Sequence, residues 1–235
     1  TKIFTYLNKY YYKKIIKRAK LRLAISENMA FEYKKRYDLD FGVSHNYVDL
    51  NVWKSSVKRL NDKNKIIIRY FGTINLKNIN ILRFFIKSIS NKNHYIFEIF
   101  TSKNNLTNSL HGSNTRVYEM LNQEEYKIKL IDSDLLLLPL SFDKISEKYA
   151  KLSIPTKLSE YLVSGVPTIV FSPPSSALSK FCTTYNCAYL INKKSESIIS
   201  NSLDELRGSD VLYEFISKRA IEVANEKLSK EIILS

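Results

Sequence analysis

The chain has 235 residues with a formal net charge of +14, and 44% of its residues are hydrophobic while 26% are charged. This balance predicts a packed core and excludes an intrinsically disordered chain. No run of about 20 apolar residues occurs, so we expect no membrane-spanning helix. The first residue is Thr1 and no signal segment follows it, which leaves open that the chain is a fragment.

The charge and the cysteines give weak indications of location and partners. Cys182 and Cys187 fit neither a disulfide framework nor zinc spacing, and we interpret them as buried thiols in a reducing cytosol. The positive charge fits a phosphate-bearing partner, but the lysines are scattered along the chain and could simply be solvated. The densest basic and aromatic cluster, over 9–22, fits an anionic membrane surface, nucleic acid or an ordinary surface helix.

The first 50 residues contain few elements. We expect a helix over 2–20, a strand over 22–26, a helix that Ser26 caps, and a strand over 41–50 that runs into a linker. These strands are too few for an independent sheet. Residues 1–50 are therefore interpreted as the end of another domain, and 52–65 as a helix or connector.

A regular alternation of strands and helices begins near residue 60. Strands are expected over 65–72, 94–100, 115–120, 134–140, 167–171 and 187–191. Helices are expected over 76–91, 123–133, 155–165, 175–184, 197–206 and 209–229. This order predicts an α/β domain over 51–235 with a doubly wound parallel sheet and flanking helices.

Ligands of such sheets bind outside the carboxyl ends of the strands. Gly72 ends the first strand of the domain, and a glycine there allows close approach of a ligand or serves only a turn. The GxGxxG fingerprint of dinucleotide binding is absent. The polar segment 139–155 after a buried strand is expected to be a long functional or mobile loop.

The stretch "SIPTKLSEYLVSGVPTIVF" (153–171) places a lysine where a helix begins. Pro155 suits the first helical position, and a cation there opposes the helix dipole. Lys157 and Glu160 are three residues apart, so they share one face. They could hold the phosphate and ribose of a nucleotide, or they could form a solvent-exposed pair of little energetic value.

The segments "SDLLLLPLSFD" and "SIPTKLSEYLVSGVPTIVF" together resemble the donor-binding half of GT-B glycosyltransferases of group 1, the GT4-like class. That class shows an apolar strand ending in Pro and then a helix of the form E-A-x-A-x-G-x-P-V, which E-Y-L-V-S-G-V-P matches without gaps. The stretches "AISENMAFEYKKRY", "VSHNYVDL" and "IIIRYFGTI" agree with the family's domain junction and glycine loop. The resemblance covers about residues 20–230.

The resemblance implies a Rossmann-like donor domain that binds a nucleotide-sugar. Glu160 would bind the ribose hydroxyls and Lys157, with Thr156, the diphosphate. Gly72 and Thr73 would lie near the diphosphate or sugar, the backbone at Met120 near the base, and the loop at Ser141 near the sugar. One departure is that Leu152 stands where many members carry a second glutamate.

The resemblance further implies a sugar transfer to a cell-surface polysaccharide or lipid-linked glycan, with no cofactor and no catalytic metal. No catalytic residue is assigned, because the acceptor-binding domain is mostly missing, and the isolated chain is expected to turn over poorly. A nucleotide-sugar epimerase and a non-catalytic binding domain remain open. We expect a cytoplasmic protein, with peripheral contact at the inner membrane face, and no nucleic-acid partner.

Overall fold

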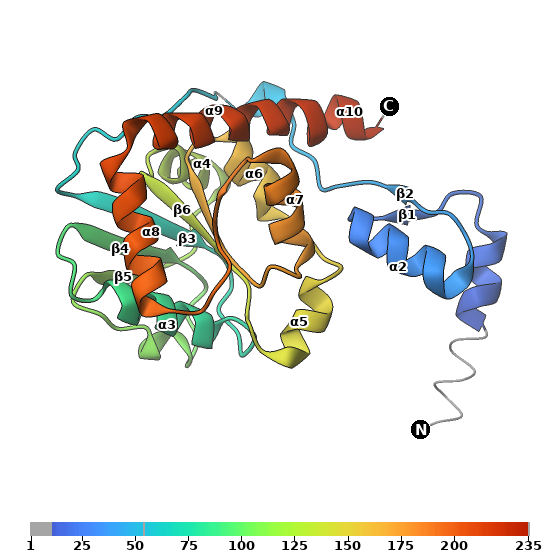
Figure 1. The fold of residues 1–235 in the computed structure, drawn as a ribbon, viewed down its shortest axis with the longest axis horizontal. Helices are drawn as coiled ribbons and strands as arrows, with labels where there is room; N and C mark the ends of the chain where they lie inside the picture. Colours follow the sequence, from blue (N-terminus) through green and yellow to red (C-terminus); the bar gives the residue numbers. More distant parts are fainter. Residues whose placement is uncertain (1–10, 54, 235) are drawn as a thin grey trace.

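A computed structural model describes residues 11–53 and 55–234. Residues 11–43 form a small lobe, which Figure 1 shows set apart from the main sheet. It contains a helical segment over 11–18, the parallel strands β1 (Leu23–Ala24) and β2 (Gly42–Val43), and α2 (Glu27–Tyr37). The Ser26 side chain caps α2, as predicted. Part of the helix predicted over 2–20 lies outside the described residues, and the division of the chain at residue 50 stays a prediction.

The main sheet confirms the predicted fold class. Its six strands are all parallel and lie in the order β5-β4-β3-β6-β7-β8. They are β3 (Ile66–Phe71), β4 (Tyr95–Phe100), β5 (Thr115–Tyr118), β6 (Leu135–Pro139), β7 (Thr168–Phe171) and β8 (Tyr189–Ile191). Numbered from β3, this is the order 3-2-1-4-5-6 of a doubly wound sheet, in which the chain changes direction between β3 and β6.

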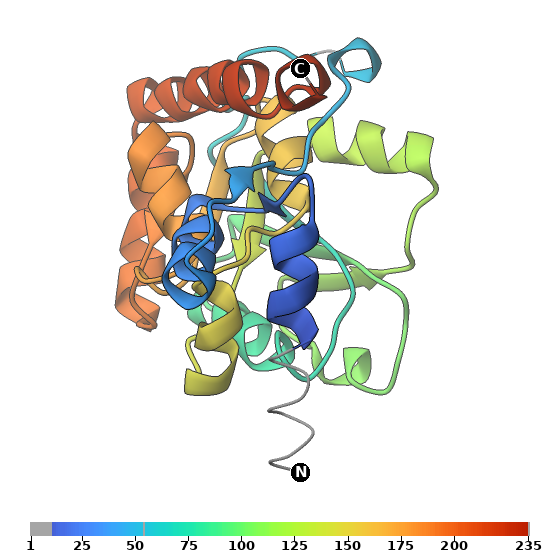
Figure 2. The same ribbon diagram turned by 90° about the vertical axis from the view of Figure 1, so that its right-hand side faces the viewer.

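Helices cover both faces of this sheet (Figures 1 and 2). The helices of this domain are α3 (Ile79–Ile89), α4 (Gln123–Ile131), α5 (Lys144–Ala150), α6 (Lys157–Val163), α7 (Ala177–Tyr185), α8 (Glu196–Gly208), α9 (Asp210–Lys227) and α10 (Lys230–Leu234). Apolar residues of α3 and α8 pack on one face, and those of α4, α6 and α7 pack on the other. Residues of α9 contribute to both clusters, so this helix ties the two layers together.

Two sequence predictions need correction. The predicted loop 139–155 contains α5, because the Asp143 carboxylate caps the backbone N–H groups of Ile145 and Ser146. The last predicted helix, over 209–229, is confirmed as α9, and the short helix α10 follows it. The helix at 155 begins later than predicted: α6 starts at Lys157, although the backbone N–H of Leu158 donates to the carbonyl of Pro155.

The strands β3 and β6 separate before they reach the carboxyl edge. They pair only at Ile68 with Leu135 and at Arg69 with Leu136, whereas the pairing of β3 with β4 and of β6 with β7 continues to the strand ends. The backbone N–H of Phe71 is therefore not taken up by β6, and it donates to the hydroxyl of Tyr161 on α6 at 3.2 Å. The hydroxyl thus joins α6 to the end of β3 at the point of separation.

A buried charge network fixes α4 against the sheet. The Arg69 side chain is 2% exposed, and its Nε donates to the Glu98 carboxylate on β4 at 2.8 Å. Its Nη1 donates to the carbonyl of Lys129 at 2.8 Å and to the Ser133 hydroxyl at 3.3 Å. The buried guanidinium thus donates hydrogen bonds to several protein acceptors instead of to water. A buried charge requires such partners. One of them is a carbonyl in the last turn of α4, so the network holds that helix end.

The small lobe contacts the main domain beyond α5 and along the linker. The Ser26 hydroxyl donates to the carbonyl of Leu152 at 2.6 Å, and the Asn28 amide donates to the carbonyl of Lys151 at 2.9 Å. The linker pairs at Val48 with Ser229 near the start of α10. The position that lacks the family's second glutamate, Leu152, thus serves as an anchor for the lobe through its backbone.

The Tyr161 hydroxyl offers a direct test of the junction between α6 and β3. Tyr161→Phe removes the acceptor of a buried N–H, and we expect the free energy of unfolding to fall by about 1–3 kcal/mol. Urea denaturation followed by circular dichroism measures this loss. Tyr185→Phe is the control, because that ring is partly buried and its hydroxyl has no hydrogen bond among the described residues. Equal stability losses in the two variants would contradict the assignment.

Candidate functional site

The residues predicted for the site all lie at the carboxyl edge of the sheet, in four groups. Gly72 and Thr73 follow β3, Met120 follows β5, and Ser141 follows β6. Thr156, Lys157 and Glu160 lie at the beginning of α6. They do not all line one cavity, because Ser141 borders one hollow while Thr156 and Glu160 border another.

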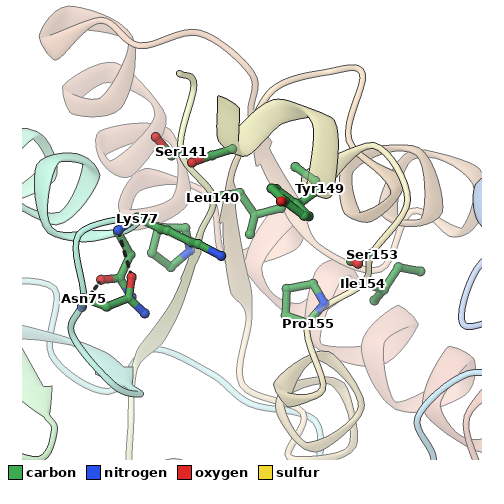
Figure 3. Close-up of a pocket in the computed structure, with 12 residues that line it drawn as sticks. Asn75, Lys77, Leu140, Ser141, Tyr149, Ser153, Ile154 and Pro155 are labelled. Atoms are coloured by element: carbon green, nitrogen blue, oxygen red, sulfur yellow. Dashed lines mark hydrogen bonds between the residues drawn. The ribbon is translucent and has the colours of Figure 1, made fainter. Parts of the chain in front are cut away.

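The first hollow, which we call the switch-point cavity, lies where β3 and β6 separate. It has a volume of about 270 Å³ and is lined by Asn75, Lys77, Asn78, Pro139, Leu140, Ser141, Ser146, Tyr149, Ala150, Ser153, Ile154 and Pro155. Figure 3 shows the loop after β3 on one side and α5 with the segment leading to α6 on the other. This is the place where doubly wound sheets bind their ligands.

Lys77 and Tyr149 meet beside the switch-point cavity. The Lys77 ammonium lies 5.0 Å from the centre of the Tyr149 ring, within range of a cation–π contact. Lys77 has no ion pair with a carboxylate in the part of the chain that the structure describes. The cavity therefore carries a positive charge that no acid neutralises directly.

The requirement for glycine at Gly72 has an explanation that involves no ligand. A Cβ atom at this position would lie 2.8 Å from the Tyr70 hydroxyl, which is closer than such atoms approach in proteins. Burial of Tyr70 raises the pKa of its hydroxyl to about 12, so the hydroxyl stays protonated. The amide of Asn78 donates to this hydroxyl at 3.1 Å and to the Thr73 carbonyl at 2.8 Å, which fixes the loop.

Lys157 does not form the solvent-exposed ion pair that spacing alone allowed. Its ammonium lies 5.1 Å from the ring centre of Tyr126 on α4, and no carboxylate of the described residues pairs with it. Burial lowers the pKa of Lys157, and the opposing effect of the Glu160 charge is smaller. The Lys157 ammonium is thus half-buried, and the attraction of the Glu160 charge only partly offsets the free-energy cost of removing it from water.

Glu160 is held by the same tyrosine. The Tyr126 hydroxyl donates to Oε2 of Glu160 at 2.7 Å, and burial raises the pKa of Tyr126. No other hydrogen bond to the Glu160 carboxylate occurs within the described residues, so Oε1 remains available as an acceptor. Tyr126 thereby orients both Lys157 and Glu160, which the sequence predicted as functional partners.

Glu160 also borders a second hollow, which we call the linker cavity. It has a volume of about 390 Å³ and is lined by Ser44, His45, Asn46, Tyr47, Thr156, Ser159 and Glu160. Its walls are the linker from the small lobe and the first turns of α6. Thr156 is exposed here, and its side chain does not cap α6.

His45 is a side chain of this cavity that the sequence analysis did not identify. Its Nδ1 lies 3.1 Å from the carbonyl of Ile25, and its Nε2 lies 3.0 Å from the Glu27 carboxylate. Both partners are acceptors, so both contacts are hydrogen bonds when the ring carries two protons. The hydrogen bond from His45 is the main reason why the pKa of Glu27 lies below its ordinary range.

Met120 lies beside a row of stacked aromatic rings. The Phe71 and Phe100 rings stack with centres 5.0 Å apart, and the Phe100 and Tyr118 rings stack with centres 5.1 Å apart. Tyr118 is 37% exposed and Met120 is 48% exposed. The end of β5 thus presents apolar and aromatic surface at the sheet's carboxyl edge.

Two of the side chains that the sequence analysis missed differ in how they could have been found. Lys77 lies five residues after Gly72; the sequence analysis assigned it to a helix over 76–91, whereas the structure places it in the turn before α3. Tyr126 lies on a helix 34 residues before Glu160, and no spacing rule connects them.

Within residues 11–53 and 55–234, no group of three or more His, Cys, Asp or Glu residues could hold a metal ion.

A search for membrane-spanning helices covered the same described residues, and none of their helices is long and apolar enough to cross a membrane.

No family model and no curated protein matches the sequence. Solved structures, in contrast, match the fold. Sucrose-phosphate synthase from Thermosynechococcus elongatus has a TM-score of 0.72 at 11% identity, over 97% of this chain and 59% of that one. HepE from Anabaena, in complex with UDP-glucose, has a TM-score of 0.68 at 12% identity, over 97% and 65%.

The C-terminal domain of a group 1 family glycosyl transferase, LpcC from Francisella tularensis, has a TM-score of 0.54 at 15% identity, over 78% of this chain and 99% of that one. At such identities the likeness establishes the fold. The chain has the fold of these solved structures, in the part that includes the C-terminal domain of LpcC, and this confirms the GT-B fold that the sequence resemblance predicted. It spans less than two thirds of the length of sucrose-phosphate synthase and HepE.

The half-buried charge of Lys157 predicts that stability depends on pH. Replacing it by Lys157→Met should raise the free energy of unfolding at pH 7 by about 0.5–2 kcal/mol, as other stabilising substitutions do. As pH rises through the lowered pKa of the folded state towards the ordinary value of lysine, wild type loses its burial penalty. The advantage of the variant should therefore shrink between pH 7 and pH 10.

Urea denaturation at the two pH values measures this difference. Lys129→Met is the matched control, because Lys129 is an exposed lysine on α4. A Lys157→Met variant whose advantage over wild type stays constant with pH would show that burial does not lower the pKa of this lysine.

Proposed function

We propose that this chain is the donor-binding part of a glycosyltransferase that uses a nucleotide diphosphate-sugar. The observation that carries the proposal is the meeting of Lys157 and Glu160 on Tyr126, at the carboxyl edge of a doubly wound sheet. A cation and a carboxylate held side by side match the two polar parts of a nucleotide diphosphate. HepE, whose structure holds UDP-glucose, supports the choice of donor class.

Each group has a defined task in this proposal. The Lys157 ammonium binds the diphosphate, and its partial burial strengthens the attraction because less water screens it. The Oε1 atom of Glu160 accepts hydrogen bonds from the ribose hydroxyls while Oε2 keeps its bond to Tyr126. Lys77 supplies a second positive charge at the switch-point cavity. The loops at Gly72, Thr73 and Ser141 surround the diphosphate and sugar.

The base is assigned to the end of β5. The exposed surface of Tyr118 and Met120 provides apolar contact for a planar ring, and the backbone after Met120 pairs with the base edge. No catalytic residue, cofactor or metal is assigned to this chain. The acceptor is a cell-surface polysaccharide or a lipid-linked glycan, and the isolated chain binds donor but transfers sugar poorly.

Peripheral contact with an anionic membrane on the cytoplasmic side is part of the same proposal. The helical segment 11–18 exposes Lys13, Lys14 and Lys17 together with Tyr12 and Ile15. Basic and apolar side chains exposed on one helix are typical of segments that lie on anionic membranes.

The proposal predicts that UDP or GDP stabilises the chain. A nucleotide present at about 100 times its Kd adds about 2.7 kcal/mol to the free energy of unfolding. For a chain of this size, that shifts the Tm upward by about 5–10 °C. Glu160→Gln and Lys157→Met should each weaken nucleotide binding about tenfold or more, since each removes a charge-assisted contact.

Thermal denaturation with UDP, GDP and their sugars measures these shifts. Glu124→Gln is the control, because Glu124 lies on the exposed side of α4 and, within the described part of the chain, pairs only with Lys127. An unchanged Tm at millimolar concentration of every nucleotide would overturn the proposal. Product analysis with a longer form of the protein separates sugar transfer from epimerisation and from binding alone.

A further inference from the structure

A second cavity adjoins the switch-point cavity on the side of α3 and α5, and we call it the outer cavity. It has a volume of about 460 Å³ and is lined by Leu76, Lys77, Asn80, Ile81, Ser141, Phe142, Asp143, Ile145, Ser146 and Lys194. Three separate chain segments form it: the loop after β3 with the start of α3, the loop after β6 with α5, and the loop after β8. The proposed donor site does not use Lys194 or Asn80.

Two lysines from different loops line the outer cavity. Lys77 lies over the Tyr149 ring at 5.0 Å, and Lys194 lies over the Phe84 ring at 4.9 Å. Neither has an ion pair with a carboxylate among residues 11–53 and 55–234. Both ammonium groups rest on aromatic rings, so each retains donors for an anion.

The one carboxylate of the cavity already has partners. Oδ1 of Asp143 accepts hydrogen bonds from the backbone N–H groups of Ile145 at 3.1 Å and Ser146 at 2.9 Å, and Oδ2 accepts from the Ser141 hydroxyl. These bonds hold the pKa of Asp143 well below its usual range. Its charge is therefore committed to the first turn of α5, and the two lysines outnumber it.

The rim of the cavity is apolar. Leu76 is 79% exposed and Ile145 is 76% exposed, and the two come from different segments of the lining, the loop after β3 and α5. Exposed branched side chains beside two lysines fit a ligand that combines an anionic group with an apolar chain.

The position of the cavity relates it to the proposed reaction. It shares Lys77, Ser141 and Ser146 with the switch-point cavity, where the donor is proposed to lie. We propose that the outer cavity binds the acceptor of the proposed transferase through a phosphate group, held by Lys77 and Lys194, with an apolar chain against Leu76 and Ile145. The identification of this ligand as the acceptor rests on the proposed function, whereas the binding of an alkyl phosphate does not.

Hexyl phosphate is the probe for this site, and titration calorimetry is the measurement. The titration is made with saturating UDP, so that the donor site is occupied. We expect hexyl phosphate to bind about tenfold tighter than inorganic phosphate, because the chain buries apolar surface. Lys194→Gln should weaken its binding about tenfold, since a charge-assisted contact is lost, and should leave UDP binding unchanged.

Lys193→Gln is the matched control, because Lys193 is the exposed neighbour of Lys194 and does not line the cavity. Equal weakening in the two variants would overturn the proposal in favour of diffuse surface charge. Equal binding of hexyl phosphate and inorganic phosphate would overturn the apolar part. Hexyl phosphate binding through Lys194 in a chain that does not bind UDP would sustain the site and overturn the donor proposal instead.

Discussion

The separation of β3 from β6 after Arg69 and Leu136 is the constraint on which the rest of the site depends. The two strands belong to the halves of a doubly wound sheet whose crossovers run in opposite directions, so their following loops diverge. Their parting opens the switch-point cavity and leaves the backbone N–H of Phe71 without a strand partner. The Tyr161 hydroxyl accepts the hydrogen bond from this N–H group, and this contact sets the position of α6.

The position of α6 then determines the chemistry. Tyr161 and Glu160 are neighbours in sequence, so a helix held through the first presents the second on an adjoining side. Tyr126 on α4 meets that side, and Arg69 and its partners hold the far end of α4. A buried network in the sheet thus acts, through α4 and Tyr126, on the two groups proposed to hold a nucleotide. Burial lowers the pKa of Lys157 in this arrangement, which is understandable if an anion completes the surroundings of the ammonium group.

The order of strands and helices could be predicted from sequence because the β-strands are short apolar runs and the helices carry periodic apolar faces. The GT-B fold followed from the match of E-Y-L-V-S-G-V-P, and solved structures confirm it. The helix α5 escaped prediction because its seven residues bury only Ala150 and thus show no apolar face. Tyr126 and His45 escaped because their partners lie 34 and 18 residues away, where only tertiary contacts relate them. Lys77 escaped because the helix predicted over 76–91 included it, whereas α3 begins only at Ile79.

The central claim is that a nucleotide diphosphate binds where β3 and β6 separate. The most direct test is to add UDP to the ¹⁵N-labelled chain and follow the backbone amide signals by NMR. We predict that the largest shifts fall on the loop Thr73–Lys77 and on the first turn of α6, from Thr156 to Glu160. Shifts confined to the opposite edge of the sheet, at residues such as His94 and Asp134, would contradict the account.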